Sequence, residues 1–232
     1  MMTIRYAQER GGADHGWLNT QHTFSFADYY DPNHMGFRTL RVINEDVIQP
    51  GTGFDLHGHR DMEVISFLIQ GSLWHRDSTG VSSVLRAGQV QCMTAGSGIR
   101  HSEHNPSKTE PTHFLQIWIL PNRKGLTPGY QQKEFPVAER QGRFRLMVSP
   151  DGADQSLTIH QDVRLFGLNL VSGGMAVYPL DPGRHAWVQV VSGGVEINGH
   201  RVSAGDGIAL SQEREVQAVG RGHGEILLFD LA

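Results

Sequence analysis

Residues 66 to 75 read SFLIQGSLWH, and residues 188 to 197 read VQVVSGGVEI. Each stretch is an apolar run typical of a strand, then a glycine turn, then a second strand-like run. LRAGQVQCMTAG follows the first stretch at 85 to 96, and VSAGDGIALSQE follows the second at 202 to 213, so both copies continue with Ala-Gly before another strand. A pattern that recurs in this order predicts two copies of one β-rich domain.

The glycines of the two copies give the offset between them. Gly71 and Gly193 are 122 positions apart, whereas Gly88 and Gly205 are 117 apart. The first copy therefore carries five extra residues between these positions, around the segment DSTGVSSV. A loop insertion accounts for the difference, because loops tolerate added residues better than strands do.

The rest of the chain also has the pattern of an all-β protein. It contains 28 glycines and 10 prolines, and turn residues bound its short apolar runs. We expect few helices and two β-barrel, jelly-roll-like domains in tandem. The runs that predict strands include 39–43, 63–69, 112–120, 164–171, 187–191, 207–211 and 225–231.

A polar segment separates the two copies. Residues 121 to 144, PNRKGLTPGYQQKEFPVAERQGRF, contain three prolines and three glycines. Such composition is typical of a linker. We predict a first domain in residues 1–130 and a second in residues 140–232.

Composition excludes several classes of partner. The 232 residues include 20 Lys plus Arg and 24 Asp plus Glu, a formal charge of −4 without long runs of either sign, which disfavours direct binding to nucleic acid or an anionic membrane. The single cysteine, Cys92, cannot form an intramolecular disulfide. The start MMTIRYAQERGG lacks the apolar core of a signal peptide, and no run reaches the roughly 20 apolar residues of a spanning helix. We expect a soluble cytoplasmic protein, either a monomer or a homodimer.

Two pairs of residues have the spacing of metal ligands. In DLHGHRDMEVISF, residues 55 to 67, His57 and His59 are two apart, and in SGIRHSEHNP the same spacing separates His101 from Glu103. Residues two apart on a strand project from the same face. Two neighbouring strands would then supply three imidazoles and a carboxylate, which suits a single divalent transition metal and leaves two open positions in an octahedral site.

Chance could also produce such a histidine pair. Thirteen histidines in this chain give about 0.7 H-x-H pairs at random. Nine of the thirteen, however, lie in the first 113 residues, and the corresponding segment of the second copy, LDPGRHAWVQVV, has only His185. We therefore expect a metal site in the first domain and none in the second, with His185 a surface or packed histidine.

The residues around these pairs resemble the two cupin motifs. GTGFDLHGHRDMEVISFLIQG, residues 51 to 71, resembles the first motif, and GQVQCMTAGSGIRHSEHN, residues 88 to 105, resembles the second. The spacing departs from most cupins: seven residues rather than six separate Glu63 from Gly71, and four rather than two separate Gly96 from His101.

The pirin branch of the cupins shares these departures. The segments HGHRDMEVISF and MTAGSGIRHSEHNP resemble the pirin signature, and the opening segment at 15 to 48 is similar to that of bacterial pirin-like proteins. The resemblance implies a bicupin with one metal in the first domain and a degenerate, metal-free second domain. It implies iron as the first expectation, with nickel, cobalt, manganese, copper or zinc as alternatives, and the ligands His57, His59, His101 and Glu103.

The general cupin rule and the pirin rule differ on the carboxylate. The general motif would make Glu63 the ligand. Glu63, like His57 and His59, has an odd number, so along a continuous strand the three side chains would project from the same face. We favour Glu103, because His101 and Glu103 lie so close together that a bulge could not separate them without disturbing both. Glu63 is then a candidate to orient a histidine by accepting its second N–H, or to form a buried salt bridge with Arg60 or Arg100.

The resemblance implies a flavonol 2,3-dioxygenase, or quercetinase, which opens the central flavonol ring with dioxygen and releases carbon monoxide. Glu103 is the first candidate to take the proton of the 3-hydroxyl group, and Glu63 is the second catalytic candidate. The alternative within the family is a non-enzymatic metal-containing co-regulator of transcription. A structural zinc site fits less well, because such sites usually recruit several cysteines and Cys92 is the only one.

A flat aromatic substrate requires an apolar slot. His104 and His113 could line its entrance, or could be solvated loop residues. Cys92 lies in a strand-like run and is expected to be buried and inert. Ordinary barrel core is the competing interpretation for every candidate wall residue: Phe24, Phe26, Phe54, Met93, Phe114 and Trp118.

Overall fold

The structure, a computed structural model, describes residues 1–232 and consists almost entirely of β-strands. The chain divides into two compact units. The N-terminal unit comprises Gly11–Glu134 and Leu157–Gln161. The C-terminal unit comprises Met1–Arg10, Phe135–Ser156 and Asp162–Ala232.

These units differ from the predicted domains, 1–130 and 140–232, in two segments. Met1–Arg10 lies with the C-terminal unit, because β1 (Met2–Arg5) pairs with β19 (Gly207–Ser211). Leu157–Gln161 lies with the N-terminal unit, where Gln131 accepts the Thr158 N–H at 3.0 Å. Neither assignment follows from local pattern, because the strand or side chain that each segment contacts is distant in sequence.

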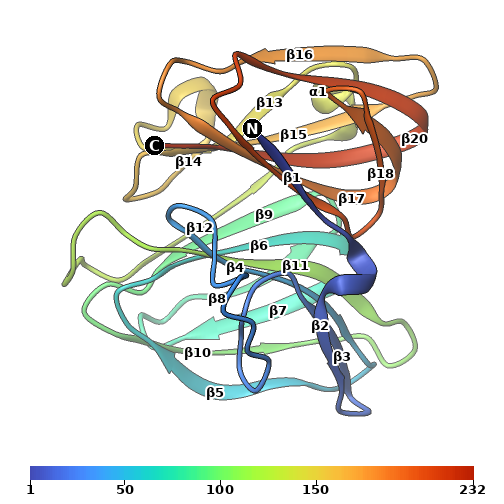
Figure 1. The fold of residues 1–232 in the computed structure, drawn as a ribbon. Helices are drawn as coiled ribbons and strands as arrows, with labels where there is room; N and C mark the ends of the chain where they lie inside the picture. Colours follow the sequence, from blue (N-terminus) through green and yellow to red (C-terminus); the bar gives the residue numbers. More distant parts are fainter. The chain divides into compact units, whose positions relative to one another are not determined.

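The N-terminal unit contains two antiparallel sheets (Figure 1). One has the strand order β12-β9-β6-β11-β4-β3-β2, and the other has the order β5-β10-β7-β8. Both sheets contribute to one apolar core, which includes Ile48, Leu68, Leu73 and Phe114. The strands are β2 (Gly11–Asp14), β3 (Leu18–His22), β4 (Leu40–Ile48), β5 (Gly53–His59), β6 (Glu63–Gln70), β7 (Ser72–Asp77), β8 (Ser82–Arg86), β9 (Gln89–Thr94), β10 (Ile99–His104), β11 (Thr112–Ile119), β12 (Gly129–Glu134) and the short β14 (Leu157–Thr158).

Alternation along these strands places polar side chains inside the unit. In β7, Leu73, His75 and Asp77 are buried while Trp74 and Arg76 are exposed. The same alternation in β10 buries its first, third and fifth residues. The inward face therefore carries ionisable groups as well as apolar ones, and each buried polar atom requires a partner.

The C-terminal unit contains one extended antiparallel sheet. Its strands run in the order β1-β19-β17-β20-β15-β13, with β16 beside β20 and β18 beside β17. Its core is aliphatic and includes Leu168, Val188, Ile208 and Leu228. The remaining elements are the 3₁₀ turns Ala7–Glu9 and Ala153–Gln155, helix α1 (Val137–Arg140), β13 (Arg145–Ser149), β15 (Val163–Leu170), β16 (Met175–Pro179), β17 (His185–Ile197), β18 (His200–Ser203) and β20 (Glu215–Leu231). No helix of the structure has the length and apolarity needed to cross a membrane.

The glycines that aligned the two sequence copies share one backbone conformation. Gly71 and Gly193 have φ of 80° and 68°, and Gly88 and Gly205 have φ of 82° and 86°. Glycine adopts this left-handed region without a steric cost. The two copies still differ locally, because Gly71 separates two strands whereas Gly193 lies inside β17, whose register with β20 shifts on either side of it.

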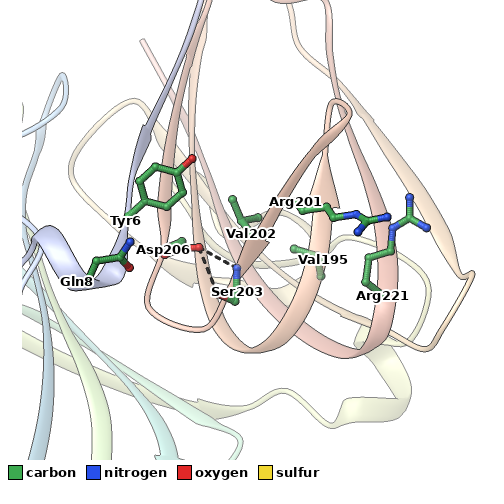
Figure 2. A pocket seen from close by; sticks show the side chains of 8 residues that line it. All are labelled: Tyr6, Gln8, Val195, Arg201, Val202, Ser203, Asp206 and Arg221. Carbon is green, nitrogen blue, oxygen red and sulfur yellow. Dashed lines mark hydrogen bonds between the residues drawn. The ribbon is translucent and has the colours of Figure 1, made fainter.

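Asp206 connects the first residues of the chain to the C-terminal unit. Its Oδ1 accepts the Ala7 N–H at 2.7 Å, and its Oδ2 accepts the Ser203 N–H at 2.8 Å; Figure 2 shows the second bond. The side chain is 4% exposed. One carboxylate thus satisfies two backbone donors from segments that are far apart in sequence.

We predict that Asp206→Ala lowers the free energy of unfolding by about 2 to 4 kcal/mol, because two backbone N–H groups lose a charged acceptor. Asp206→Asn, which keeps one acceptor oxygen, should lose less. Glu9→Ala is the matched control, since Glu9 accepts the Tyr6 N–H at an exposed position. Urea denaturation measures all three, and equal losses for Asp206→Ala and Glu9→Ala would contradict the prediction.

Candidate metal centre

Three histidines from two paired strands meet in the N-terminal unit. His57 and His59 lie on β5, and His101 lies directly opposite His57 on β10. The ring centroids are 4.9 Å apart for His57 and His59, 4.4 Å for His57 and His101, and 4.8 Å for His59 and His101. Their ligand atoms lie within 4.8 Å of one another, close enough for one ion to contact all three.

A β-bulge shapes the face on which these histidines lie. His101 pairs with His57, but Glu103 pairs with Phe54, so β5 has one more residue than β10 between these pairs. The bulge falls in β5, where Asp55 and Leu56 are exposed, while β10 keeps its alternation. His101 and Glu103 therefore share the inward face, as the sequence predicts, although a bulge does occur opposite them.

Glu103 is fully buried and held by two amides. Gln91 Nε2 donates to Oε1 at 3.0 Å, and Gln116 Nε2 lies 3.4 Å from Oε2. Glu103 forms a second group of potential ligands with His101 and His75, again within 4.8 Å. The four residues expected as ligands thus occur in two overlapping groups that share His101.

Glu63 lies apart from both groups. It accepts a hydrogen bond from the Thr94 hydroxyl at 2.9 Å, and its Oε1 is 3.4 Å from His160 Nδ1. Its partners are therefore these two residues rather than Arg60 or Arg100. Glu63 was expected to share the face of His57 and His59 because all three have odd numbers. This expectation does not hold, because β5 and β6 belong to different sheets and the alternation of one strand does not continue into the other.

The electrostatics of the cluster suit a cation. Burial lowers the pKa of His59 to about 4 and that of His101 to about 4, so both imidazoles are neutral at pH 7. Burial by itself would raise the pKa of Glu103, but the hydrogen bond from His75, the electrostatic attraction of His101 and His75, and the hydrogen bond from Gln91 outweigh it and lower the pKa to about 2. Neutral imidazoles beside an ionised carboxylate are the protonation states that bind a divalent metal.

Hydrogen bonds indicate which nitrogen of each ring is available. His57 Nδ1 lies 2.7 Å from the Asp55 carbonyl oxygen, so Nδ1 donates and Nε2 keeps its lone pair. His75 Nε2 lies 2.8 Å from Asp77 Oδ2, and His75 Nδ1 lies 3.4 Å from His101 Nδ1. When Nε2 of neutral His75 donates a hydrogen bond to Asp77, Nδ1 of His75 accepts a hydrogen bond from the Nδ1–H of His101. His101 Nε2 then carries no proton and is an acceptor.

His101 Nε2 has no hydrogen-bond partner although it is buried. An unpaired buried acceptor is unfavourable, and a metal ion would satisfy it. The residues present therefore fit a divalent metal. Sequence reasoning missed His75 and Asp77, although the H-x-D spacing in SLWHRD places both on one face of a strand.

The charge on His75 responds to its neighbours. Burial opposes protonation, but Glu103 and Asp77 together raise the pKa of His75. Protonated His75 would donate from Nδ1 and so reverse the bond to His101. A cation at His101 repels that added proton, so metal binding and the neutral form of His75 favour each other.

The expected aromatic wall is only partly present. Phe54 lines a cavity of about 630 Å³ together with His57 and His104, so the expected position of His104 at an entrance is compatible with the structure. Trp118 meets the His59 ring edge-on at 5.0 Å. Phe26 lines a neighbouring cavity of about 300 Å³. The other candidates have structural surroundings: Phe24, Met93 and Phe114 are buried, and His113 pairs with Glu45 at 2.9 Å.

Two single residues behave as expected. Cys92 is buried, and burial raises the pKa of its thiol, which makes it a poor nucleophile. His185 in the C-terminal unit contacts the Ser211 hydroxyl at 2.7 Å. Both groups of potential metal ligands lie in the N-terminal unit.

The C-terminal unit has a cavity of a different kind. Figure 2 shows its lining, which includes Tyr6, Arg201 and Arg221 and encloses about 560 Å³. Arg221 forms an ion pair with Glu196, so part of the positive charge is neutralised. Its lining contains one carboxylate, Asp206, and neither of the candidate groups of metal ligands.

Comparison with known proteins identifies the family. Residues 3–119 match the family model of pirin, and residues 146–231 match that of the quercetinase C-terminal cupin domain. The chain belongs to the pirin family. The sequence prediction of an all-β bicupin is confirmed.

Relatives of this pirin include proteins with known structures. Quercetin 2,3-dioxygenase of Escherichia coli K12 is 48% identical over 231 residues, which cover 100% of this chain and 99% of that protein. The crystal structure of the bacterial pirin YhhW from Escherichia coli in complex with nickel(II) has a TM-score of 0.95 and 48% identity, covering 100% of this chain and 99% of that chain. A pirin-like protein of Caulobacter vibrioides is 43% identical over 224 residues, 96% of each chain.

We predict that Asp77→Asn lowers metal affinity by about 10- to 100-fold. Thr79 N–H and Oγ1–H both donate to Asp77 Oδ1, so the new amide would keep its oxygen there and turn its NH₂ toward His75. His75 would then donate from Nδ1, and His101 Nε2 would carry the proton. Chelator competition for nickel(II) measures the affinity. Arg76→Gln is the control, since Arg76 is exposed on the same strand; unchanged affinity in Asp77→Asn would exclude this account of the tautomers.

A second buried acid, Asp46 on β4, escaped the sequence analysis. It is 2% exposed, and burial raises its pKa to about 7 against the hydrogen bond from Thr20. The folded state therefore retains this proton above the ordinary value of 3.8, and stability falls as pH rises from about 4 through 7. The stability that protonated Asp46 contributes is lost completely only above the pKa of Asp46 in the folded state.

We expect Asp46→Asn to flatten this pH dependence. At pH 8 the variant should be more stable than the parent by about 1 to 4 kcal/mol, and at pH 4 the two should be nearly equal. Urea denaturation of the metal-free proteins between pH 4 and 8 tests this. Glu134→Gln, at an exposed position of β12, should keep the slope of the parent. A constant difference between parent and Asp46→Asn at every pH would show that Asp46 does not titrate as described.

Proposed function

We propose that this pirin is a metal-dependent flavonol 2,3-dioxygenase, which opens the central ring of quercetin-like flavonols with dioxygen and releases carbon monoxide. The observation that carries the proposal is the buried, unpaired Nε2 of His101 within a cluster of histidines beside an ionised glutamate. The relative from Escherichia coli that is named quercetin 2,3-dioxygenase supports the same activity.

We propose His57, His59, His101 and Glu103 as the residues that hold the metal. Iron is our first expectation, and nickel, cobalt, manganese, copper or zinc would also suit nitrogen and oxygen donors. The nickel(II) complex of the relative YhhW supports a divalent metal in this family. When bound, such a cation supplies positive charge that lowers the pKa of a substrate hydroxyl group.

Glu103 is the group we propose to accept the proton of the flavonol 3-hydroxyl. The amides of Gln91 and Gln116 orient its two oxygens, and its burial excludes competing water. A carboxylate with a pKa of about 2 is a weak base, so the transfer requires a hydroxyl group that is already acidified. Glu63 takes no part in this proposal, because its partners are Thr94 and His160.

The apolar surroundings suit a flat aromatic substrate. Phe54 and Trp17, in edge-on contact at 5.2 Å, line the cavity that also contains His57. Trp118 covers His59 from another direction. Aromatic walls around a few polar groups are typical of sites that bind small planar molecules.

We predict that Glu103→Gln lowers turnover of quercetin at least about 100-fold while part of the metal content remains, because the amide can still coordinate through oxygen but cannot accept the proton. Glu63→Gln is the matched control and should keep turnover within about threefold of the parent. Loss of flavonol absorbance, carbon monoxide release and metal content are measured together. Full turnover by metal-loaded Glu103→Gln would remove Glu103 from this role.

The same assay tests the function as a whole. Parent protein loaded in turn with iron, nickel, cobalt, manganese or copper is incubated aerobically with quercetin. Turnover with any of these metals supports the dioxygenase. Absence of turnover with all five would contradict it and favour a non-enzymatic metal-binding regulator.

A further inference from the structure

A cavity of about 300 Å³ lies beside the candidate metal centre, within the N-terminal unit. Trp17, Leu18, Phe26 and Phe54 form apolar parts of its wall. Phe54 also lines the larger cavity that contains His57, and its ring lies 6.2 Å from the His57 ring. The two cavities are therefore neighbours that share the Phe54 and Trp17 side chains.

The opposite part of the wall is polar and comes from the interior face of the seven-stranded sheet. Asn44 and Asp46 lie two apart on β4 and both line the cavity. Across the strand pairs, Thr20 lies opposite Asp46 and Gln116 lies opposite Asn44. Gln116 also lies within hydrogen-bond distance of Glu103, so this wall is continuous with the metal centre.

Two acceptors on this wall have no partner. Asn44 Oδ1 and Asp46 Oδ1 are both buried and without a hydrogen bond, and each residue is only 2% exposed. Leaving one such atom unpaired is unfavourable, and here both residues line a space large enough for a ligand. A bound molecule with hydrogen-bond donors would satisfy both.

Charge and shape restrict what that molecule can be. Burial raises the pKa of Asp46 to about 7, so the environment disfavours a full negative charge and suits a neutral donor such as a hydroxyl group. Aromatic side chains on the facing wall favour a flat ring. A volume of about 300 Å³ is at the low end for ligand cavities, which leaves space for a substituted ring rather than for a whole flavonol.

We propose that this cavity binds a hydroxylated outer ring of the substrate, whose hydroxyl groups donate to Asn44 and Asp46. The flavonol nucleus then extends past Phe54 toward His57. The proposal rests on the proposed function for the identity of the substrate, and it makes Asn44 and Asp46 specificity-determining residues for polyphenols over unsubstituted analogues.

The test compares quercetin with 3-hydroxyflavone, which keeps the flavonol nucleus and lacks the outer-ring hydroxyl groups. Both are titrated by calorimetry into nickel-loaded protein under nitrogen, where no dioxygen is present for turnover. The parent should bind quercetin more tightly. At pH 8, above the pKa of Asp46, Asp46→Asn should reduce this preference by about 10-fold and Asn44→Ala by about threefold, because a hydrogen bond to an ionised carboxylate contributes more than one to an amide.

Glu45→Gln is the matched control, since Glu45 neighbours both residues on β4 but pairs with His113 outside the cavity. It should keep the preference of the parent within about twofold. Thermal unfolding confirms that each variant is folded, and Asn44→Ala gives an independent reading if Asp46→Asn fails to fold. An unchanged preference in both cavity variants would overturn the proposal.

The outcome is distinguishable from failure of the proposed function. Preferential quercetin binding that Asp46→Asn abolishes, without aerobic turnover by the parent, would support the cavity and contradict the dioxygenase. Turnover by the parent with no preference between the two flavonols would contradict outer-ring binding in the cavity and would still support the dioxygenase activity.

Discussion

The pairing of β5 with β10 is the constraint on which the candidate site depends. It sets His57 directly opposite His101, and the bulge in β5 brings Phe54 to the same face. A shift of one residue in this register would turn every second side chain to the other face and disperse the histidines. The bulge therefore serves the site, because it supplies an aromatic wall without moving the ligands.

Buried polar groups inside a barrel are unfavourable unless they are hydrogen-bonded, and the groups around Glu103 and Asp77 meet this requirement. Around Glu103, Gln91 donates to the carboxylate and in turn accepts from the Tyr130 hydroxyl at 3.2 Å. Asp77 accepts from His75 and from Thr79. The buried atoms without a partner include His101 Nε2, Asn44 Oδ1 and Asp46 Oδ1, and these three belong to residues where a metal or a substrate could supply the missing partner.

The two units differ in where histidines gather. Both copies keep the left-handed glycines at equivalent sequence positions, because a positive φ favours a residue without a side chain. Both groups of potential metal ligands lie in the N-terminal unit, whereas the core of the C-terminal unit is aliphatic and includes Val188 and Ile226. Its first strand, β1, comes from the other end of the chain, so the two units are not consecutive in sequence.

The sequence by itself determined the all-β class, the repeat, and the shared faces of His57 with His59 and of His101 with Glu103, because strand alternation and glycine turns are local properties of the chain. Glu63, His75, Asp77 and Asp46 could not be placed in this way. Whether a buried acid faces a histidine, a threonine or an empty cavity depends on which strands become neighbours, and that is set by pairing between residues far apart in sequence. Tertiary structure therefore decided the tautomers, the unpaired acceptors and the cavity, since each of them arises only where several strands meet.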